Sequence, residues 1–287
     1  MSAATAFDPG SFKQATRDQW DKAARGWDES SAIVRDWLYQ ATEAMLNMAG
    51  VQLGSRVLDV AAGAGDQTLD IAARIGPNGH VLATDLSAEI LEYAKRKLAR
   101  AGYGNIAIQV ADGESLAVEE AHFDAVVCRL GLMLMPDPSA ALREMSHALK
   151  PGGRVCCMVF STPTANPCVA IAMSTALKHA GHPLRDPYQP GGLFSLGKPG
   201  LMDDLFRQAG FRDVATTRIS APFKLASASA YLQFIRSSAS PILQILDSLD
   251  DTAKHAAWTD VELQLNRFNT AKGWEGQNEL LLTAARR

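Results

Sequence analysis

Apolar and polar positions follow two different periods along most of the chain. From residue 56 onward, short runs rich in valine, isoleucine and leucine are separated by longer stretches in which apolar residues recur every three or four positions. The short runs indicate buried strands, and the longer period indicates amphipathic helices. We predict strands at residues 56–60, 80–84, 106–110, 123–128, 154–160, 213–219 and 279–284. This alternation predicts an α/β fold with a doubly wound, mostly parallel seven-stranded sheet.

Turn-forming residues mark the ends of the predicted helices. The segment Gly76-Pro-Asn-Gly79 ends a helix over residues 66–75, and Ser87 is placed to cap a second helix that reaches residue 101. Ahead of the first strand, two amphipathic helices are predicted at residues 11–27 and 32–48. Further helices are predicted at residues 139–149, 201–209, 228–235 and 251–268.

The alternation stops after residue 160. Residues 161–198 are rich in proline and glycine and contain one short apolar helix pattern at 169–178. A segment of this length exceeds an ordinary connection between a strand and a helix. We expect it to be a helical insertion which, with the N-terminal helices, forms a cap over the edge of the sheet.

The composition excludes several classes of protein. The chain is 47% hydrophobic and 21% charged, and 28 Lys and Arg residues nearly balance 31 Asp and Glu residues, so nothing attracts nucleic acid over a long range. No segment reaches the roughly 18 apolar residues that a membrane span needs. The four cysteines form no C-x-x-C pair, which argues against a disulfide framework and a metal site. We expect a cytoplasmic protein with no nucleic-acid partner, no membrane span and no metal.

The candidate chemistry lies at the carboxyl ends of the first three predicted strands. Gly63 and Gly65 form a turn of small residues after the first strand, where a ligand can approach the backbone closely. Asp59, Asp85 and Asp112 lie at or just past the ends of these strands. Converging carboxylates are costly unless they accept hydrogen bonds or face a cation. A cationic, hydroxyl-rich ligand would meet that requirement.

Two nucleoside ligands compete for this edge of the sheet. Asp85 follows Gly65 by 20 residues and is placed to accept hydrogen bonds from both hydroxyls of a ribose. A dinucleotide fingerprint requires a third glycine where this chain has Thr68, and Asp66 adds a negative charge that would repel a pyrophosphate. S-adenosylmethionine carries the same ribose but a positive sulfonium in place of phosphates. An acid-lined turn therefore favours S-adenosylmethionine.

Six motifs together carry a resemblance to a known family. They are VLDVAAGAG (57–65), ATDLS (83–87), VADGE (110–114), FDAVVCRLGLM (123–133), LKPGGR (149–154) and AGF (209–211). With them the chain resembles class I S-adenosylmethionine-dependent methyltransferases, in the group similar to ubiquinone/menaquinone-biosynthesis and related small-molecule methyltransferases. The resemblance spans about residues 15–220 and implies the Rossmann-like methyltransferase fold, with S-adenosylmethionine as cofactor and S-adenosylhomocysteine as product.

The resemblance also implies roles for the residues of the first two motifs. Ala61, Gly63 and Gly65 would approach the methionine and ribose parts of the cofactor. Asp85, followed by Leu86, would hold the ribose diol. The family more often has glycine at the position of Ala61, and close relatives tolerate alanine there.

Further positions follow from the same resemblance. Asp112 and Gly113 would meet the adenine, and Arg129 would lie beside the methionine end of the cofactor. The family's N-terminal helix folds over the cofactor, which places Trp20 or Trp27 at the pocket.

Some of these residues also have purely structural interpretations. Asp59 is equally suited to capping the turn and to contacting the cofactor. Arg129 could instead form an ion pair with Asp137 or Glu144. The two N-terminal tryptophans are seven residues apart on one helix face and would by default belong to the core.

Methyl transfer is an in-line displacement, so the protein mainly aligns the two reactants and excludes water. A base is needed only for some acceptors, and the sequence candidates are His179, His182, Asp186 and Tyr188, each more typical of a surface residue. An apolar lining would favour a hydrophobic or aromatic small molecule as acceptor, methylated on O, N or C. The residues expected to supply that lining are Leu132, Met133, Leu134, Met135, Met158, Phe160, Met173, Phe194 and Phe234.

The chain divides into four predicted parts. These are an N-terminal helical cap (1–50), an S-adenosylmethionine-binding core (51–160), a substrate-side insertion (161–200) and a C-terminal part of the core with further cap helices (201–287). Two other functions stay open beside methyl transfer: a protein that binds S-adenosylmethionine without transferring a methyl group, and a nicotinamide-dependent oxidoreductase. A homodimer is compatible with each.

Overall fold

The computed structural model describes residues 8–183 and 186–287, and its centre is one seven-stranded sheet. The strand order is β3-β2-β1-β4-β5-β10-β6. The first five strands in this order run parallel, and β10 is antiparallel to both β5 and β6. The strands are β1 (Arg56–Val60), β2 (His80–Asp85), β3 (Ile106–Val110), β4 (Phe123–Arg129), β5 (Leu149–Phe160), β6 (Arg212–Ser220) and β10 (Glu279–Arg286). The predicted α/β fold and its seven-stranded, mostly parallel sheet are confirmed.

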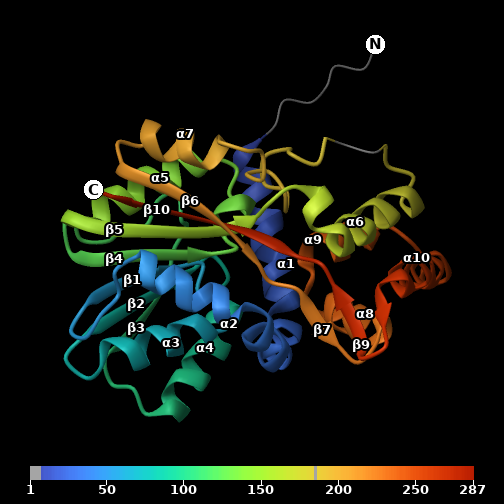
Figure 1. Cartoon of the computed structure of the whole chain (residues 1–287), viewed down its shortest axis with the longest axis horizontal. Helices are drawn as coiled ribbons and strands as arrows, with labels where there is room; N and C mark the ends of the chain where they lie inside the picture. Colours follow the sequence, from blue (N-terminus) through green and yellow to red (C-terminus); the bar gives the residue numbers. More distant parts are fainter. Residues whose placement is uncertain (1–7, 184–185) are drawn as a thin grey trace.

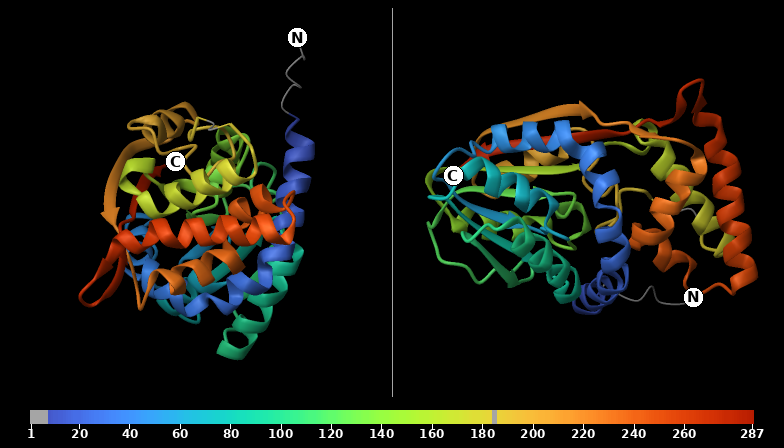
Figure 2. Two further views of the ribbon diagram at one scale, coloured as in Figure 1. Left: turned by 90° about the vertical axis from the view of Figure 1, so that its right-hand side faces the viewer. Right: turned by 90° about the horizontal axis from the view of Figure 1, so that it is seen from below.

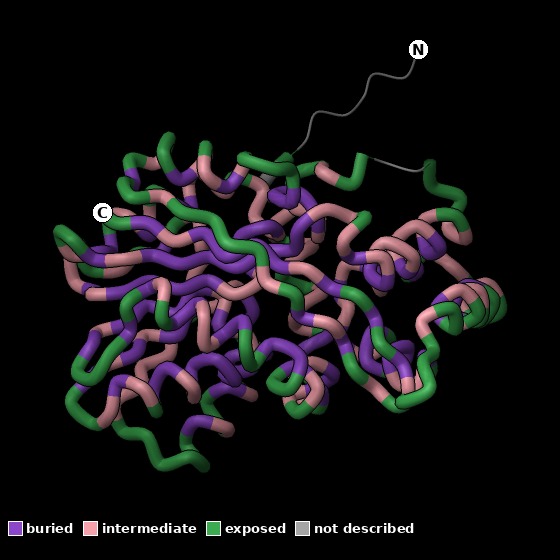
Figure 3. Tube along the Cα trace, in the orientation of Figure 1, coloured by how far each residue is buried: buried purple, intermediate pink, exposed green. Residues whose placement is uncertain are grey.

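Helices cover both faces of the sheet. On one face α2 (Ser31–Met48), α3 (Asp66–Ile75) and α4 (Ala88–Ala101) pack in succession, and on the other α5 (Pro138–Ala148) packs beside α7 (Leu201–Gln208). Figure 3 shows the central strands buried along most of their length and the edge strand β6 largely exposed. The apolar runs of the central strands read as continuous because both of their faces are buried.

A second group of elements covers the end of the sheet where the parallel strands finish. Figure 1 shows α6, α8, α9 and α10 gathered there, and Figure 2 shows α1 between them and the strands. The helices of this group are α1 (Pro9–Glu29), α6 (Pro167–His179), α8 (Ala228–Ser238), α9 (Ser240–Leu246) and α10 (Asp251–Leu265). Short 3₁₀ turns are η1 (Leu132–Leu134), η2 (Pro163–Ala165) and η3 (Asn266–Phe268).

Two features of this covering group were not predicted. A small antiparallel sheet joins β7 (Phe223–Leu225), β9 (Gly273–Gly276) and β8 (Asn269–Thr270), whose strands are too short to show a period of two. The helical segment after residue 228 is divided into α8 and α9, which are separated only by Ala239. The division occurs there because Pro241 lacks the backbone N–H that a continuous helix would need.

Among the residues that the structure describes, no helix is long and apolar enough to cross a membrane.

Candidate functional site

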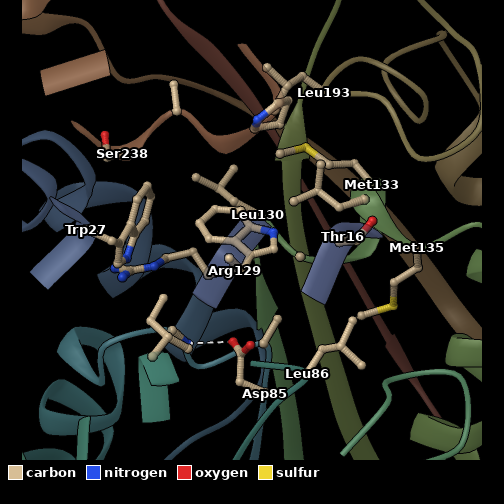
Figure 4. A pocket seen from close by; sticks show the side chains of 18 of the residues that line it. Thr16, Trp27, Asp85, Leu86, Arg129, Leu130, Met133, Met135, Leu193 and Ser238 are labelled. Carbon is tan, nitrogen blue, oxygen red and sulfur yellow. Dashed lines mark hydrogen bonds between the residues drawn. The ribbon is translucent and has the colours of Figure 1, made fainter. Parts of the chain in front are cut away.

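One large cavity lies between the carboxyl ends of the parallel strands and the covering helices. It is lined by residues of the loops after β1 to β4 and by residues of α1, α8 and α9. Figure 4 shows Asp85 and Leu86 at one end of this cavity and Leu193 at the other. Its empty volume is about 1460 Å³, with open solvent at its mouth included.

The turn after β1 is held in place by Asp85, the last residue of β2. The two Asp85 carboxylate oxygens accept hydrogen bonds from the backbone N–H groups of Gly63 and Ser87, both at 3.0 Å. Burial raises the pKa of Asp85, while these backbone donors lower it. Ala61, Gly63, Asp85 and Leu86 all line the cavity. The predicted edge is therefore a continuous wall in which Asp85 connects two loops.

Backbone conformation explains the small residues of this turn. Ala61 has a φ of 56° and Gly63 a φ of 58°, in the left-handed region that favours glycine. A Cβ on Gly63 would lie 3.3 Å from the Trp27 indole nitrogen, so glycine also lets α1 approach the turn. Ala61 stands at the position where the family more often has glycine, and it holds the strained conformation with a side chain.

Two residues predicted to bind the cofactor lie outside the cavity lining. Gly65 begins α3 with a φ of 83°, and a Cβ there would lie 3.0 Å from the Cβ of Ala94, so its smallness serves the packing of α3 on α4. Asp59 is fully buried and accepts hydrogen bonds from the side chains of Gln67 and Thr68. Burial raises the pKa of Asp59 to about 6, although both hydrogen bonds lower it. These donors are side chains of α3 and not the backbone amides of the turn, so the structural role of Asp59 differs from the predicted turn cap. Cofactor contact by Asp59 or Gly65 stays a prediction.

The loop after β3 meets the N-terminal helix through an ion pair that the sequence did not reveal. The Lys13 ammonium on α1 lies 2.7 Å from an Asp112 oxygen and 2.6 Å from a Glu114 oxygen. Lys13, Asp112, Gly113 and Glu114 all line the cavity. Lys13 and Asp112 are 99 positions apart, and the periodicity of α1 marks Lys13 only as a polar position.

Arg129, at the end of β4, reaches the cavity without an ion-pair partner among the described residues. Its guanidinium donates one side-chain hydrogen bond, 2.9 Å long, to the Thr42 hydroxyl. Burial lowers the pKa of Arg129, and Asp66 and Asp59 oppose that shift. The alternative pairing with Asp137 or Glu144 is wrong, because Asp137 lies 3.8 Å from Arg143 and Glu144 accepts a hydrogen bond from a backbone N–H.

The charge of Asp66 has a different role from the one expected. Asp66 is 2% exposed, lies outside the cavity lining and pairs with the Lys97 ammonium at 2.7 Å. Its charge is therefore compensated inside the protein and does not act to repel a pyrophosphate, which corrects the argument made from sequence. Within residues 8–183 and 186–287, the cavity lining has three carboxylates, on Asp85, Asp112 and Glu114, and two cations, on Lys13 and Arg129.

Both N-terminal tryptophans line the cavity while packing in a small core between α1 and α4. The rings of Trp20 and Trp27 meet edge to face with centroids 5.7 Å apart, and Trp27 lies 6.4 Å from Phe234 of α8. Trp20 and Trp27 are therefore both core residues and cavity-lining residues.

The part of the cavity away from Asp85 is apolar and aromatic. Trp37 stacks on Phe223 with ring centroids 4.0 Å apart, and Tyr231 meets Phe223 edge to face at 5.0 Å. Five of the expected lining residues do line the cavity: Met133, Leu134, Met135, Phe160 and Phe234. The other four point into the core or lie elsewhere: Leu132, Met158, Met173 and Phe194. Three further aromatic lining residues were missed, because only long-range packing brings them to this edge: Trp37 of α2, Phe223 of β7 and Tyr231 of α8.

The strands and loops at the Asp85 end of the cavity belong to a segment that is typical of a known protein family. Residues 24–179 match the sequence profile of the ubiE/COQ5 methyltransferase family, which is more than half of the chain. This chain belongs to that family. The matched segment includes β1 to β5 and the loops that build the Asp85 end of the cavity.

Individual relatives of this methyltransferase-family protein cover less of it. The chain is 38% identical over 122 residues to the ubiquinone/menaquinone biosynthesis C-methyltransferase UbiE of Pseudomonas aeruginosa, which is 42% of this chain and 48% of that protein. The chain therefore aligns with about half the length of the curated relatives it matches.

Solved structures share the fold at low identity. Phosphoethanolamine N-methyltransferase 2 of Haemonchus contortus, in complex with S-adenosyl-L-methionine, aligns with a TM-score of 0.55 at 16% identity and covers 91% of this chain and 57% of that one. The [4+2]-cyclase SpnF aligns with a TM-score of 0.54 at 19% identity and covers 86% of this chain and 80% of that one. At such identities the likeness concerns the fold alone.

None of the four candidate bases of this family member lines the cavity. The His179 ring lies 3.0 Å from Asp260 of α10, and Tyr188 packs under the Lys198 ammonium at 4.9 Å. His182 and Asp186 are exposed. The structure brings none of them to the place where an acceptor would bind.

Proposed function

We propose that this protein is an S-adenosylmethionine-dependent methyltransferase that acts on a small, hydrophobic or aromatic molecule. The observation that carries the proposal is the division of one cavity into two chemically different halves. The half around Asp85 combines the glycine turn with carboxylates, and the other half is built from aromatic and aliphatic side chains. We call these the cofactor half and the acceptor half.

The residues of the cofactor half fit S-adenosylmethionine, whose sulfonium supplies a methyl group that a nucleophile can attack. Asp85 uses one lone pair of each oxygen on backbone N–H groups and keeps others for a ribose diol. Arg129 has donors to spare for the methionine carboxylate. Asp112 and Gly113 would border the adenine. An excess of carboxylates over cations in the lining suits a ligand with net positive charge.

The acceptor half suggests catalysis by alignment. Among the described residues, the charged side chains of the cavity lining belong to α1 and to the ends of, or the loops after, β2, β3 and β4, which border the cofactor half: Lys13, Asp85, Asp112, Glu114 and Arg129. The aromatic walls would orient a flat acceptor and exclude water, which favours an in-line attack on the methyl carbon. The acceptor atom would then be nucleophilic by itself, without a protein base.

Binding of S-adenosylmethionine without methyl transfer is the second candidate, because a cyclase shares this fold. The two are separated by incubating the protein with S-adenosylmethionine labelled in its methyl group and with a metabolite extract. Methyl transfer predicts label in organic-soluble small molecules. Label in protein or nucleic acid, or no label anywhere while the cofactor binds, would contradict the proposed function.

A further inference from the structure

Tyr231 stands in the wall of the acceptor half with its ring fixed on several sides. The residue belongs to α8, is 1% exposed and lines the cavity. Its ring stacks on Trp274 with centroids 4.8 Å apart, and Phe223 meets it edge to face. Trp274 is itself anchored, because its indole N–H donates to the Leu265 carbonyl at 2.8 Å. The position of the Tyr231 hydroxyl is therefore set by packing.

That hydroxyl makes no hydrogen bond within the part of the chain that the structure describes. Among the same residues, two buried side-chain atoms, Arg56 Nε and Ser240 Oγ, have neither solvent access nor a hydrogen-bond partner. The Tyr231 oxygen is not one of them, so it keeps access to open space. Since the residue lines the cavity and is otherwise buried, that space is the acceptor half.

Neighbouring polar groups are satisfied inside the protein. The Trp37 indole N–H donates to the Ala221 carbonyl at 2.8 Å, and the Ser238 hydroxyl donates to the Phe234 carbonyl at 2.6 Å. Burial raises the pKa of Tyr231 well above its ordinary value, with the Cys168 thiol as a smaller contribution, so the hydroxyl keeps its proton. A buried donor without a partner is unfavourable until a ligand supplies an acceptor atom.

We propose that Tyr231 is a specificity-determining residue, whose hydroxyl donates a hydrogen bond to an oxygen of a neutral, flat and mainly apolar methyl acceptor. A carbonyl or ether oxygen on an aromatic ring system has this chemistry. The flat shape follows from the stacked walls of Trp37, Phe223 and Tyr231, and the neutrality follows from the lack of charged side chains among the described residues that line the acceptor half. The inference rests on the proposed function and names its substrate class.

The test uses the full chain saturated with S-adenosylhomocysteine and two probes of similar shape. Titration calorimetry compares 2-acetylnaphthalene, which has a carbonyl oxygen, with 2-isopropylnaphthalene, which has none. We expect the unaltered protein to bind the ketone about tenfold more tightly than the hydrocarbon. Tyr231→Phe should bind both probes equally. Tyr39→Phe, the same change on a side chain that is 63% exposed, should behave like the unaltered protein.

Equal ketone preference in Tyr231→Phe and the unaltered protein would overturn the inference, and so would failure of the unaltered protein to bind either probe. Thermal unfolding is the second measurement. Loss of an unpartnered hydroxyl should leave the midpoint of Tyr231→Phe unchanged or raise it, and a clear drop would reveal an internal partner and overturn the inference. Failure to bind S-adenosylhomocysteine would count against the proposed function itself, which separates the two outcomes.

Discussion

Two aspartates at the ends of neighbouring strands show how environment gives one residue type different roles. Asp85 shares its oxygens between two backbone N–H groups and still faces the cavity. Asp59, one strand away, is sealed beneath α3 and accepts from Gln67 and Thr68. Each carboxylate accepts one hydrogen bond on each of its oxygens, but Asp85 lines the cavity, where a ligand can reach its remaining lone pairs, whereas Asp59 is buried outside the lining. Asp59 therefore affects stability more directly than binding.

Stability should depend on pH through Asp59. Burial raises its folded pKa to about 6 from an ordinary value of 3.8, so the folded protein favours the protonated carboxyl. The contribution of Asp59 to the free energy of unfolding is fully present below about pH 4 and is lost as the pH rises towards and through 6. Relative to Asp59→Asn, the unaltered protein should lose up to about 3 kcal/mol of unfolding free energy between pH 4 and 7. Urea unfolding of both proteins across this range measures the difference, and a difference that is constant with pH would contradict it.

Sequence reasoning worked at this scale where the contacts are local. The Gly63 turn and Asp85 follow from a strand, a tight turn and the next strand along the chain, and such consecutive strands are usually neighbours in the sheet. Lys13 and Tyr231 could not be found in that way. Each acquires its role from partners far away in the chain, and neither lies in a pattern that differs from an ordinary helix face.

At the scale of elements, the helix α1 forms part of the cavity wall and is attached to the rest of the protein by two different kinds of contact. Its middle packs on α4 through Trp20 and Trp27, while Lys13 near its beginning reaches across to the loop after β3. The helix is thus attached at two places, to α4 and to the loop after β3. Removing one attachment should loosen the corresponding part of α1 without disturbing the sheet.

Lys13→Met tests that attachment. The pair is partly buried, with side-chain exposures of 26% for Lys13 and 7% for Glu114, so its loss should cost about 1 kcal/mol locally. Hydrogen exchange of the α1 amides should accelerate by about fivefold, and exchange in α3 should not change. Lys22→Met is the matched control on the same helix, because Lys22 is exposed and lies 3.9 Å from Asp247. Equal effects of the two substitutions would show that the Lys13 ion pair does not hold α1.

Element boundaries were predictable where periodicity is long and were missed where it is short. The seven strands of the main sheet and the helices between them follow from runs of apolar residues. The small sheet of β7, β9 and β8 has strands of two to four residues, which is too short for any period to appear. Its stability comes from Trp274 and Phe223, which are buried against the covering helices.

At the scale of the whole molecule, the cavity exists because distant parts of the chain cover the same edge of the sheet. The N-terminal α1 and the segment between β6 and β10 close over loops that belong to the family-matched part (Figures 1 and 2). The matched segment, residues 24–179, contains the strand ends and loops of the cofactor half but not Lys13 of α1, whereas α8 and α9, which contribute to the acceptor half, lie beyond it. This arrangement is expected if the cofactor is common to the family and the methyl acceptor is specific to this chain. The four-part division made from the sequence stays a prediction.

The central claim is that the cofactor half binds S-adenosylmethionine through Asp85. Titration calorimetry with S-adenosylhomocysteine tests it most directly, with Asp85→Asn as the variant, Asp204→Asn on the surface of α7 as the matched control, and NAD as the competing ligand. We predict that the unaltered protein and the control bind S-adenosylhomocysteine, that Asp85→Asn binds it at least about tenfold more weakly, and that none binds NAD. Binding of NAD, or undiminished binding of S-adenosylhomocysteine by Asp85→Asn, would contradict the account.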